Sequence, residues 1–228
     1  MKKSGKTKAS KKKGIFVTAT DTGVGKTFVA SSLAYLLRKK GINVGVMKPF
    51  ATGTEIHDDK FKSQDTALLA QAADVDDSDV ILNPVFFPVA ASPLMASVIM
   101  DQKVNLAPIR GAYCELETKH DFLIVEGIGG IMVPLTTRLL LAHFARFLGL
   151  PIIIVSRPNL GSINHTLLTV NACIKYGLEV CGIVINRMPL NANTVESMTP
   201  DLIHKLTGIP ISAVIPEQHK ARYELGSR

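Results

Sequence analysis

The chain has 228 residues, 46% of them apolar, which is enough for one α/β domain with a single large core. No uninterrupted apolar run reaches the roughly 18 residues that a membrane span needs, and no apolar stretch of a secretory signal opens the chain. Three cysteines without a C-x-x-C pair argue against a disulfide framework or a zinc site and favour a reducing, cytoplasmic compartment.

The formal net charge of +7 comes from the start of the chain. Residues 1–13 hold seven lysines and no acidic residue, and the remaining 19 basic residues equal the 19 acidic ones. We therefore expect 1–13 to be a disordered, solvated arm and 14–228 to form one domain. The alternative is an arm that tethers the protein to RNA or another anionic surface. The neutral body offers no further nucleic-acid signal, so we expect no nucleic-acid partner.

From residue 14 onward, short apolar runs alternate with helical patterns. The predicted order is a strand at 14–20, a helix over 28–41, a strand at 42–49, a helix over 65–73, then strands at 122–127, 151–156, 180–186 and 211–216 with helices near 138–148, 164–176 and 198–207 between them. Almost wholly apolar strands that alternate with helices indicate an α/β fold, a mainly parallel sheet with helices on both faces. Ligands of such sheets gather beyond the carboxyl ends of the strands.

Residues 83–104 are the longest stretch that resembles a loop. Pro84, Pro88 and Pro93 interrupt it. A long loop inside a compact domain is often functional. The alternative is an apolar flap that covers one edge of the sheet, and the residues alone leave both interpretations open.

The stretch TATDTGVGKT, residues 18–27, lies between the first strand and the first helix. The pattern G-x-x-x-x-G-K-[ST] requires a glycine at position 20, where Thr20 stands, but a strand before the stretch and a helix after it are the context of a P-loop. Gly23 and Gly25 let backbone N–H groups approach phosphate oxygens. Lys26 can reach the β- and γ-phosphates, and the Thr27 hydroxyl can bind Mg²⁺.

Further polar residues follow the predicted strands. Lys48 ends the second strand and Thr52 lies in the turn after it; a plain surface lysine is the alternative for Lys48. Asp65 begins a helix and Glu126 ends a strand, and carboxylates at such places hold the metal in P-loop enzymes. The alternatives are an acid that stabilises a helix start and an ordinary strand-ending turn.

Gly161 and Ser162 open the helix that follows the strand at 151–156. The free N–H groups at such a helix start can bind an anion. The alternative is an ordinary capped helix that carries Asn164 and His165 on its surface.

With these motifs in order, the chain resembles the dethiobiotin synthetases. The resemblance covers roughly residues 14–217 and rests on the order and spacing of TDTGVGKT, KPFATG, SQD, ASP, EGIGG with VPL, LGSINHTLLT, GIVIN and IPE. It implies a P-loop NTPase fold and an ATP- and Mg²⁺-dependent enzyme of biotin biosynthesis. In that family 7,8-diaminononanoate (7,8-diaminopelargonate) and CO2 are closed to dethiobiotin, with ADP and phosphate released, through a carbamate and a carbamic–phosphoric anhydride.

The resemblance also implies roles for individual residues. Catalytic roles are implied for Lys26, Lys48 and Thr22, and metal binding for Thr27, Asp65 and Glu126. Nucleotide contacts are implied for Asp21, Thr22, Gly23, Val24, Gly25, Lys26, Thr27, Asn186, Pro216 and Glu217, with Asn186 at the adenine edge. Substrate contacts are implied for Thr52, Ser92, Gly161, Ser162, Ile163 and Asn164. In the family the last four residues come from the other subunit, which implies a homodimer with the substrate site at its interface.

The chain departs from the family pattern in places. Ala19 stands where many members have glycine, and His143 stands where an aspartate is common. Members often continue with a further helix after the IPE motif, whereas only 11 residues follow Glu217 here.

Three other interpretations compete with this one. A P-loop ATPase switch of the partition type has a second lysine in its loop, at the place where Asp21 stands here. A ligase related to the cobyrinate amidases carries an added amidotransferase domain, for which the chain has no room. An ATPase that acts on RNA through the lysine arm finds no support in the neutral body.

Overall fold

The structure is a computed structural model and describes residues 14–53 and 57–217. The predicted basic arm, 1–13, and the last 11 residues lie outside the described residues. None of the described helices is long and apolar enough to cross a membrane.

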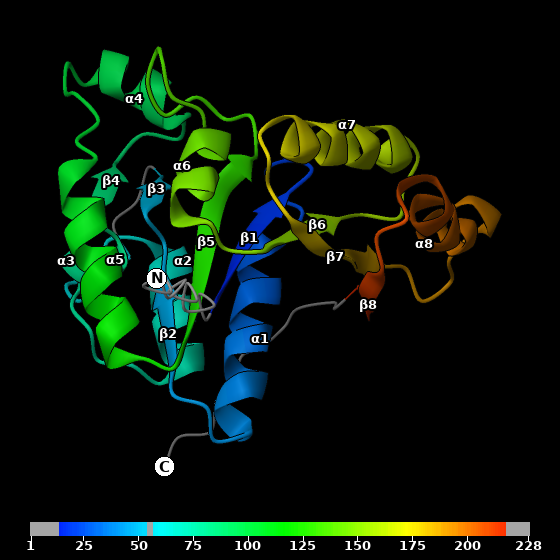
Figure 1. Cartoon of the computed structure of the whole chain (residues 1–228), viewed down its shortest axis with the longest axis horizontal. Coiled ribbons are helices and arrows are strands. Elements are labelled where there is room, and N and C mark those ends of the chain that lie inside the picture. Colours follow the sequence, from blue (N-terminus) through cyan, green and yellow to red (C-terminus); the bar gives the residue numbers. More distant parts are fainter. Residues whose placement is uncertain (1–13, 54–56, 218–228) are drawn as a thin grey trace, which may run out of the picture.

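One parallel sheet of six strands organises the domain. Its strands are β1 (Gly14–Ala19), β2 (Val44–Met47), β5 (Phe122–Gly130), β6 (Ile152–Ser156), β7 (Val180–Met188) and β8 (Ile211–Pro216). The order across the sheet is β2-β5-β1-β6-β7-β8, which Figure 1 shows running from β2 on one side to β8 on the other. All six residues of β1 are buried, so both faces of the central sheet are covered. The predicted mainly parallel α/β fold is therefore confirmed.

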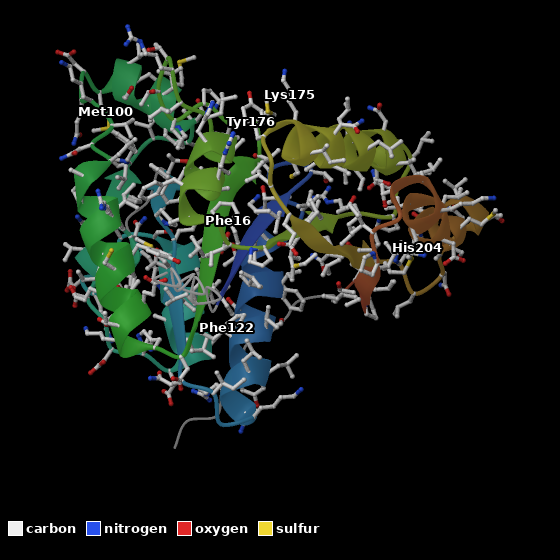
Figure 2. The ribbon with its side chains drawn as sticks, viewed as in Figure 1. Phe16, Met100, Phe122, Lys175, Tyr176 and His204 are labelled. Atoms are coloured by element: carbon white, nitrogen blue, oxygen red, sulfur yellow. The ribbon has the colours of Figure 1, made fainter. Side chains whose placement is uncertain are left out.

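Helices pack against this sheet on its two sides. They are α1 (Lys26–Lys39), α2 (Gln64–Ala73), α3 (Asp79–Leu82), α4 (Pro93–Ile99), α5 (Ala107–Lys119), α6 (Leu141–Leu148), α7 (Ser162–Lys175) and α8 (Thr194–Thr207). Helices α2, α3 and α5 lie toward the β2 edge, and α7 and α8 pack together beside β6, β7 and β8 (Figure 1). Phe16 of β1 lies in the middle of the molecule (Figure 2). Its ring packs edge-on against that of Phe144 of α6.

The region 83–104 is more ordered than a loop. It contains the short strand β4 (Val85–Phe87), which pairs in parallel with β3 (Phe50–Thr52), and the helix α4. The Ser92 hydroxyl accepts a hydrogen bond from the Met95 N–H and so caps α4, and Pro93 occupies its first turn. This segment therefore has a fixed shape beside the carboxyl end of β3.

Several helices differ from the prediction. Helices α3 and α5 were not predicted, and α6 begins at Leu141, after the predicted start near 138. Helix α8 begins at Thr194, before the predicted start near 198. Asn193 and Glu196 form a capping box that fixes this earlier start, and Pro200 lies inside the helix. Proline is tolerated in the first turn of a helix and disfavoured in its interior, so Pro200 favours a start near 198 on the residue pattern alone.

His143 has a structural role in this fold. Its Nδ1 accepts a hydrogen bond from the Leu140 N–H at the start of α6, and its ring packs on that of Tyr176. Ala19 is fully buried at the end of β1. Both departures from the family pattern are thus accommodated within the packed domain.

Candidate active site

A cavity of about 530 Å³ opens at the carboxyl ends of the strands. It is lined by most of the residues that the sequence predicted, namely Thr22, Gly23, Gly25, Lys26, Thr27, Lys48, Thr52, Asp65, Ser92 and Glu126. Its remaining wall consists of Ala51, Ala90, Ala91, Ile128, Gly129, Val133 and Arg187. The predicted P-loop, the predicted metal ligands and the loop between β4 and α4, which ends at Ser92, thus line one cavity.

The P-loop leaves β1 and enters α1 as predicted. Gly23 and Gly25 have φ angles of 69° and 97°, in the left-handed region where a side chain is strained, and Gly25 is the N-cap of α1. A Cβ on Gly25 would also collide with the amide group of Asn186. Thr20 replaces the first glycine of the pattern, but the two glycines on which the loop conformation depends, Gly23 and Gly25, are both present.

Lys26 lies at the first turn of α1 and is mostly buried. Its Nζ is 3.3 Å from the Asp21 carbonyl oxygen. Burial, and then the nearby charge of Lys48, lower the pKa of Lys26 to about 8, although Glu126 and Asp65 oppose the shift. A lysine with this pKa is charged at neutral pH. No carboxylate of residues 14–53 or 57–217 forms an ion pair with it, so it is available to a phosphate.

Three oxygen-bearing side chains converge beside it. The Thr27 hydroxyl lies 2.9 Å from Oδ1 of Asp65 and 2.9 Å from Oε1 of Glu126. A hydroxyl carries one proton, so it can donate to only one of the two carboxylates at a time. These residues are 38 and 99 positions from Thr27 in the sequence, and the strand order brings them together as predicted.

Lys48 occupies the centre of this group. Its Nζ is 2.5 Å from Oε1 of Glu126, 2.8 Å from Oδ2 of Asp65 and 3.2 Å from the Gly127 carbonyl oxygen. Burial opposes a charge on Lys48, but Glu126 and Asp65 outweigh it and raise its pKa. The lysine is therefore a permanent cation of the site, and the alternative of a surface lysine is excluded because its side chain is only 3% exposed.

The residues fit a magnesium ion. Oε2 of Glu126 is buried and has no hydrogen-bond partner among the described residues, although a buried carboxylate oxygen normally has one. Oxygen ligands suit Mg²⁺, which commonly takes one or two carboxylates and completes its shell with phosphates and water. No group of three or more His, Cys, Asp or Glu side chains that could hold a metal occurs in the described parts of the chain. A site with two carboxylates and one hydroxyl therefore needs the phosphates of a nucleotide to be complete.

Two side chains from neighbouring strands hold the P-loop. The amide Nδ2 of Asn186, at the end of β7, donates to the Val24 carbonyl oxygen at 2.8 Å, and Asn186 is only 3% exposed. Arg157, just after β6, donates through its guanidinium to the Gly23 carbonyl oxygen. The phosphate loop is thus tied to the β6 and β7 side of the sheet.

Several predicted residues lie outside the cavity lining. Asp21 and Val24 belong to the P-loop but do not line the cavity, and neither do Asn186, Pro216, Glu217, Gly161, Ser162, Ile163 and Asn164. Pro216 pairs with Met188 and the Glu217 N–H donates to the Met188 carbonyl oxygen, so both lie beside the end of β7.

Residues 161–164 form the start of α7. No side chain caps this helix, and the Ser162 hydroxyl and N–H both donate to the Asn159 carbonyl oxygen. Within one chain these residues do not meet the phosphate site.

Arg187 was not singled out from the sequence. It directly follows Asn186 and lines the cavity. The signal that could have identified it is its position at the carboxyl end of a parallel strand, immediately after the GIVIN motif.

Known proteins place the chain within a family. Residues 13–224 match the model of an AAA domain. Two solved structures share the fold: a ParA family ATPase from Chlorobium tepidum (TM-score 0.58, 19% identity, 92% of this chain and 86% of that one) and the septum site-determining protein MinD from Pyrococcus horikoshii (TM-score 0.56, 22% identity, 90% and 82%). The chain is thus a P-loop protein of the AAA-domain family.

Closer relatives define the particular family. A protein of Nitrosopumilus maritimus is 39% identical over 204 residues, 90% of this chain and 89% of its own. One of Methanocaldococcus jannaschii is 40% identical over 206 residues, 88% and 92%, and one of Bacillus subtilis (strain 168) is 39% identical over 205 residues, 90% and 87%. All three are named ATP-dependent dethiobiotin synthetase BioD. The chain belongs to the dethiobiotin synthetase family.

Proposed function

We propose that the chain closes the ureido ring of dethiobiotin from 7,8-diaminononanoate, CO2 and ATP, a step of biotin biosynthesis. The observation that carries the proposal is the cluster of Lys48, Asp65, Glu126 and Thr27 beside the P-loop, inside one cavity with Thr52 and Ser92. The identity of the substrates is taken from the dethiobiotin synthetase family. The same cavity has the P-loop at its wall for the phosphates and Thr52 and Ser92 beside it for the diamine.

The chemistry begins with the diamine. One amine adds to CO2 and loses a proton to give a carbamate. A carbamate oxygen then attacks the γ-phosphorus, the bond to the bridging oxygen of ADP breaks, and a carbamic–phosphoric anhydride results. The second amine attacks the anhydride carbon, loses a proton and expels phosphate as the ring closes.

The residues of the site act on the charge that develops during phosphoryl transfer. Lys26 and the N–H groups of the P-loop bind the phosphate oxygens, and Lys48 is placed to neutralise the carbamate as it approaches the γ-phosphate. Thr27, Asp65 and Glu126 would hold Mg²⁺, which supplies further positive charge to the β- and γ-phosphates when bound. Thr22 and Thr52 contact the carbamate and phosphates, and Ser92 lies near the amines.

The ends of the two substrates need further binding groups. Asn186, Pro216 and Glu217 surround the nucleoside in this proposal, with Asp21 and Val24 as part of the P-loop. Residues 161–164 bind the carboxylate of the diamine from the partner subunit of a homodimer, through the free N–H groups at the start of α7. We place the reaction in the cytoplasm, which agrees with three cysteines that are all free thiols.

A partition-type ATPase switch is the alternative function. The fold likeness to ParA and MinD proteins is at 22% identity or less, which shows architecture alone. Asp21 is an acid whose side chain accepts a hydrogen bond from the Thr22 N–H, and it cannot replace a phosphate-binding lysine.

The test is product formation followed by mass spectrometry. Protein, ATP, Mg²⁺, labelled bicarbonate and 7,8-diaminononanoate are combined, and each component is omitted in turn. We expect labelled dethiobiotin only in the complete reaction, its loss in Lys26→Ala, and its retention in Lys39→Ala, a matched control at the exposed end of α1. ATP consumption that is independent of the diamine and gives no dethiobiotin would reject the proposal in favour of an ATPase.

A further inference from the structure

A bulge interrupts β7 where this strand meets the cavity. Ile185 pairs with Val214 of β8, and Met188 pairs with Pro216, so three steps along β7 match two along β8. One extra residue is therefore inserted at Asn186–Arg187. Bulges of this kind are common next to active sites, where they redirect a side chain.

The backbone of Arg187 is strained at this bulge. Its φ angle is 60°, in the left-handed region that residues other than glycine rarely adopt. Two other residues with a side chain have a positive φ in the described ranges, Asp74 and Asp101, and neither lines the cavity. Strain of this type persists where the surrounding structure enforces it and is concentrated at functional sites.

The bulge sets the direction of the Arg187 side chain. Residues two apart on a regular strand share a face, and Ile185 is fully buried, so an uninterrupted strand would turn Arg187 into the packed interior. Instead Arg187 is exposed and lines the cavity. Asn186 is fixed on the Val24 carbonyl oxygen at the same time, so the bulge lets adjacent residues serve the P-loop and the cavity.

Arg187 has no anionic partner in the part of the chain that the structure describes: no carboxylate lies within 4.0 Å of its guanidinium there. Lys48, by contrast, is paired with Asp65 and Glu126 inside the same cavity. A guanidinium is always charged, and its fork of N–H groups matches the oxygens of a phosphate. An arginine without an anionic partner, placed in a nucleotide cavity, can therefore bind a phosphate group of the nucleotide.

The strand order indicates which phosphate it meets. Glu126 lies in β5 and Lys48 directly follows β2, both on one side of β1. Arg187 lies near the end of β7, two strands from β1 on the other side. A triphosphate with its γ-phosphate at the metal ligands therefore extends its nucleoside end toward β7. We propose that Arg187 is a nucleotide-binding residue that contacts the α-phosphate of ATP and ADP. The proposal rests on ATP as the co-substrate of the proposed function.

The test measures ADP and ATP binding by calorimetry in the absence of the diamine. Arg187→Gly removes the guanidinium, and glycine tolerates a φ of 60°, so this variant keeps the bulge without strain. We expect the Kd for both nucleotides to rise about tenfold or more, the size typical of one charge-assisted phosphate contact. Arg187→Lys should restore part of the affinity because it keeps the charge without the fork.

Two controls make the result specific. Arg146→Ala removes an exposed arginine from α6 and should leave both Kd values unchanged. Inorganic tripolyphosphate keeps the three phosphates without a nucleoside, so Arg187→Gly should raise its Kd by a factor similar to that for ATP, whereas an effect confined to ATP would place the contact at the nucleoside and overturn the assignment. Far-UV circular dichroism and the melting temperature establish that each variant is folded.

The possible outcomes separate this inference from the proposed function. Unchanged Kd values in folded Arg187→Gly, or an effect confined to the KM for the diamine, would overturn the assignment of Arg187. A raised Kd for ADP in a protein that makes no dethiobiotin would support the assignment and reject the proposed reaction. A wild-type chain that binds neither nucleotide would overturn both.

Discussion

The ammonium group of Lys48 lies 2.5 Å from Oε1 of Glu126, and both side chains are buried. The two residues are 78 positions apart in the sequence and come from neighbouring strands, β2 and β5. Removal of one partner of a buried ion pair destabilises the fold, because the other charge stays buried without an opposite charge beside it. The pair therefore connects the chemistry of the site with the stability of the domain.

The first prediction concerns this pair. Lys48→Met should abolish dethiobiotin formation and lower the free energy of unfolding by about 3–5 kcal/mol, because Glu126 remains fully buried without its cation. Denaturant unfolding measures the loss. The double variant Lys48→Met/Glu126→Gln should recover much of the stability and none of the activity. Full stability in Lys48→Met alone would contradict the energetic role of the pair.

The second prediction concerns metal binding without nucleotide. Lys48 pairs with both carboxylates that would hold a metal, so its positive charge competes with a divalent cation. We expect Lys48→Met to bind Mn²⁺ more tightly than the wild type, and Asp65→Asn to bind it more weakly. Electron paramagnetic resonance of free Mn²⁺ gives both affinities. Weaker binding in Lys48→Met would show that the lysine organises the metal ligands instead of competing for them.

The third prediction concerns pH. The pKa of Lys26 is lowered to about 8, chiefly by burial, so the lysine loses its proton as the pH rises through 8. Phosphate binds the charged form, and ATP affinity should therefore fall as the pH rises past about 8, by up to about tenfold per pH unit. Lys26→Arg keeps its charge over this range and should flatten the profile. Calorimetry in buffers of different ionisation enthalpy should also detect proton uptake on ATP binding near pH 8 in the wild type. A profile that falls equally in both proteins would contradict the assignment to Lys26.

The fourth prediction concerns Asn186. Its amide donates to the Val24 carbonyl oxygen, so Asn186→Ala should loosen the P-loop and weaken ATP and GTP alike. The proposed contact with adenine adds a further loss for ATP alone. We therefore expect the Kd to rise for both nucleotides and more for ATP. A loss confined to ATP would contradict the tether to the P-loop, and equal losses would contradict the adenine contact.

The fifth prediction concerns the thiols. Burial raises the pKa of Cys173 to about 12, whereas Cys114 and Cys181 are exposed. A thiol reagent at pH 8 should therefore modify Cys114 quickly and Cys173 only after unfolding, with Cys181 slower than Cys114 because burial raises the pKa of its thiol as well. Mass spectrometry of the labelled protein would show this order. Rapid labelling of Cys173 in the native chain would indicate that the packing around α7 differs from that described.

The sequence predicted the parts of the fold that depend on local pattern. Apolar strands that alternate with helices defined the parallel sheet, and the rule that ligands gather at the carboxyl ends of strands placed Lys48, Asp65 and Glu126 in one site. The helix α5 escaped detection even though Ile109, Ala112, Tyr113 and Leu116 are buried at helical spacing. Polar and charged residues between them weaken the apolar pattern, and tertiary packing decides such cases.

Other features depend on contacts between distant residues. The sequence indicated that Lys48 and Glu126 belong to the site, but not that they pair, because an ion pair depends on side-chain geometry across two strands. Arg187 escaped detection for a similar reason. The direction of the Arg187 side chain depends on a bulge between β7 and β8. No local motif predicts a register shift that involves a strand more than 20 residues away.

In the proposed reaction a carbamate oxygen attacks the γ-phosphate. Bicarbonate labelled with ¹⁸O at all oxygens tests this step, with short incubations that limit exchange with water. The account predicts one ¹⁸O in the released phosphate and one in the ureido carbonyl of dethiobiotin, both measured by mass spectrometry. Unlabelled phosphate formed together with dethiobiotin, under conditions where the bicarbonate pool retains its label, would contradict the anhydride. ATP would then be cleaved by water and not by the carbamate.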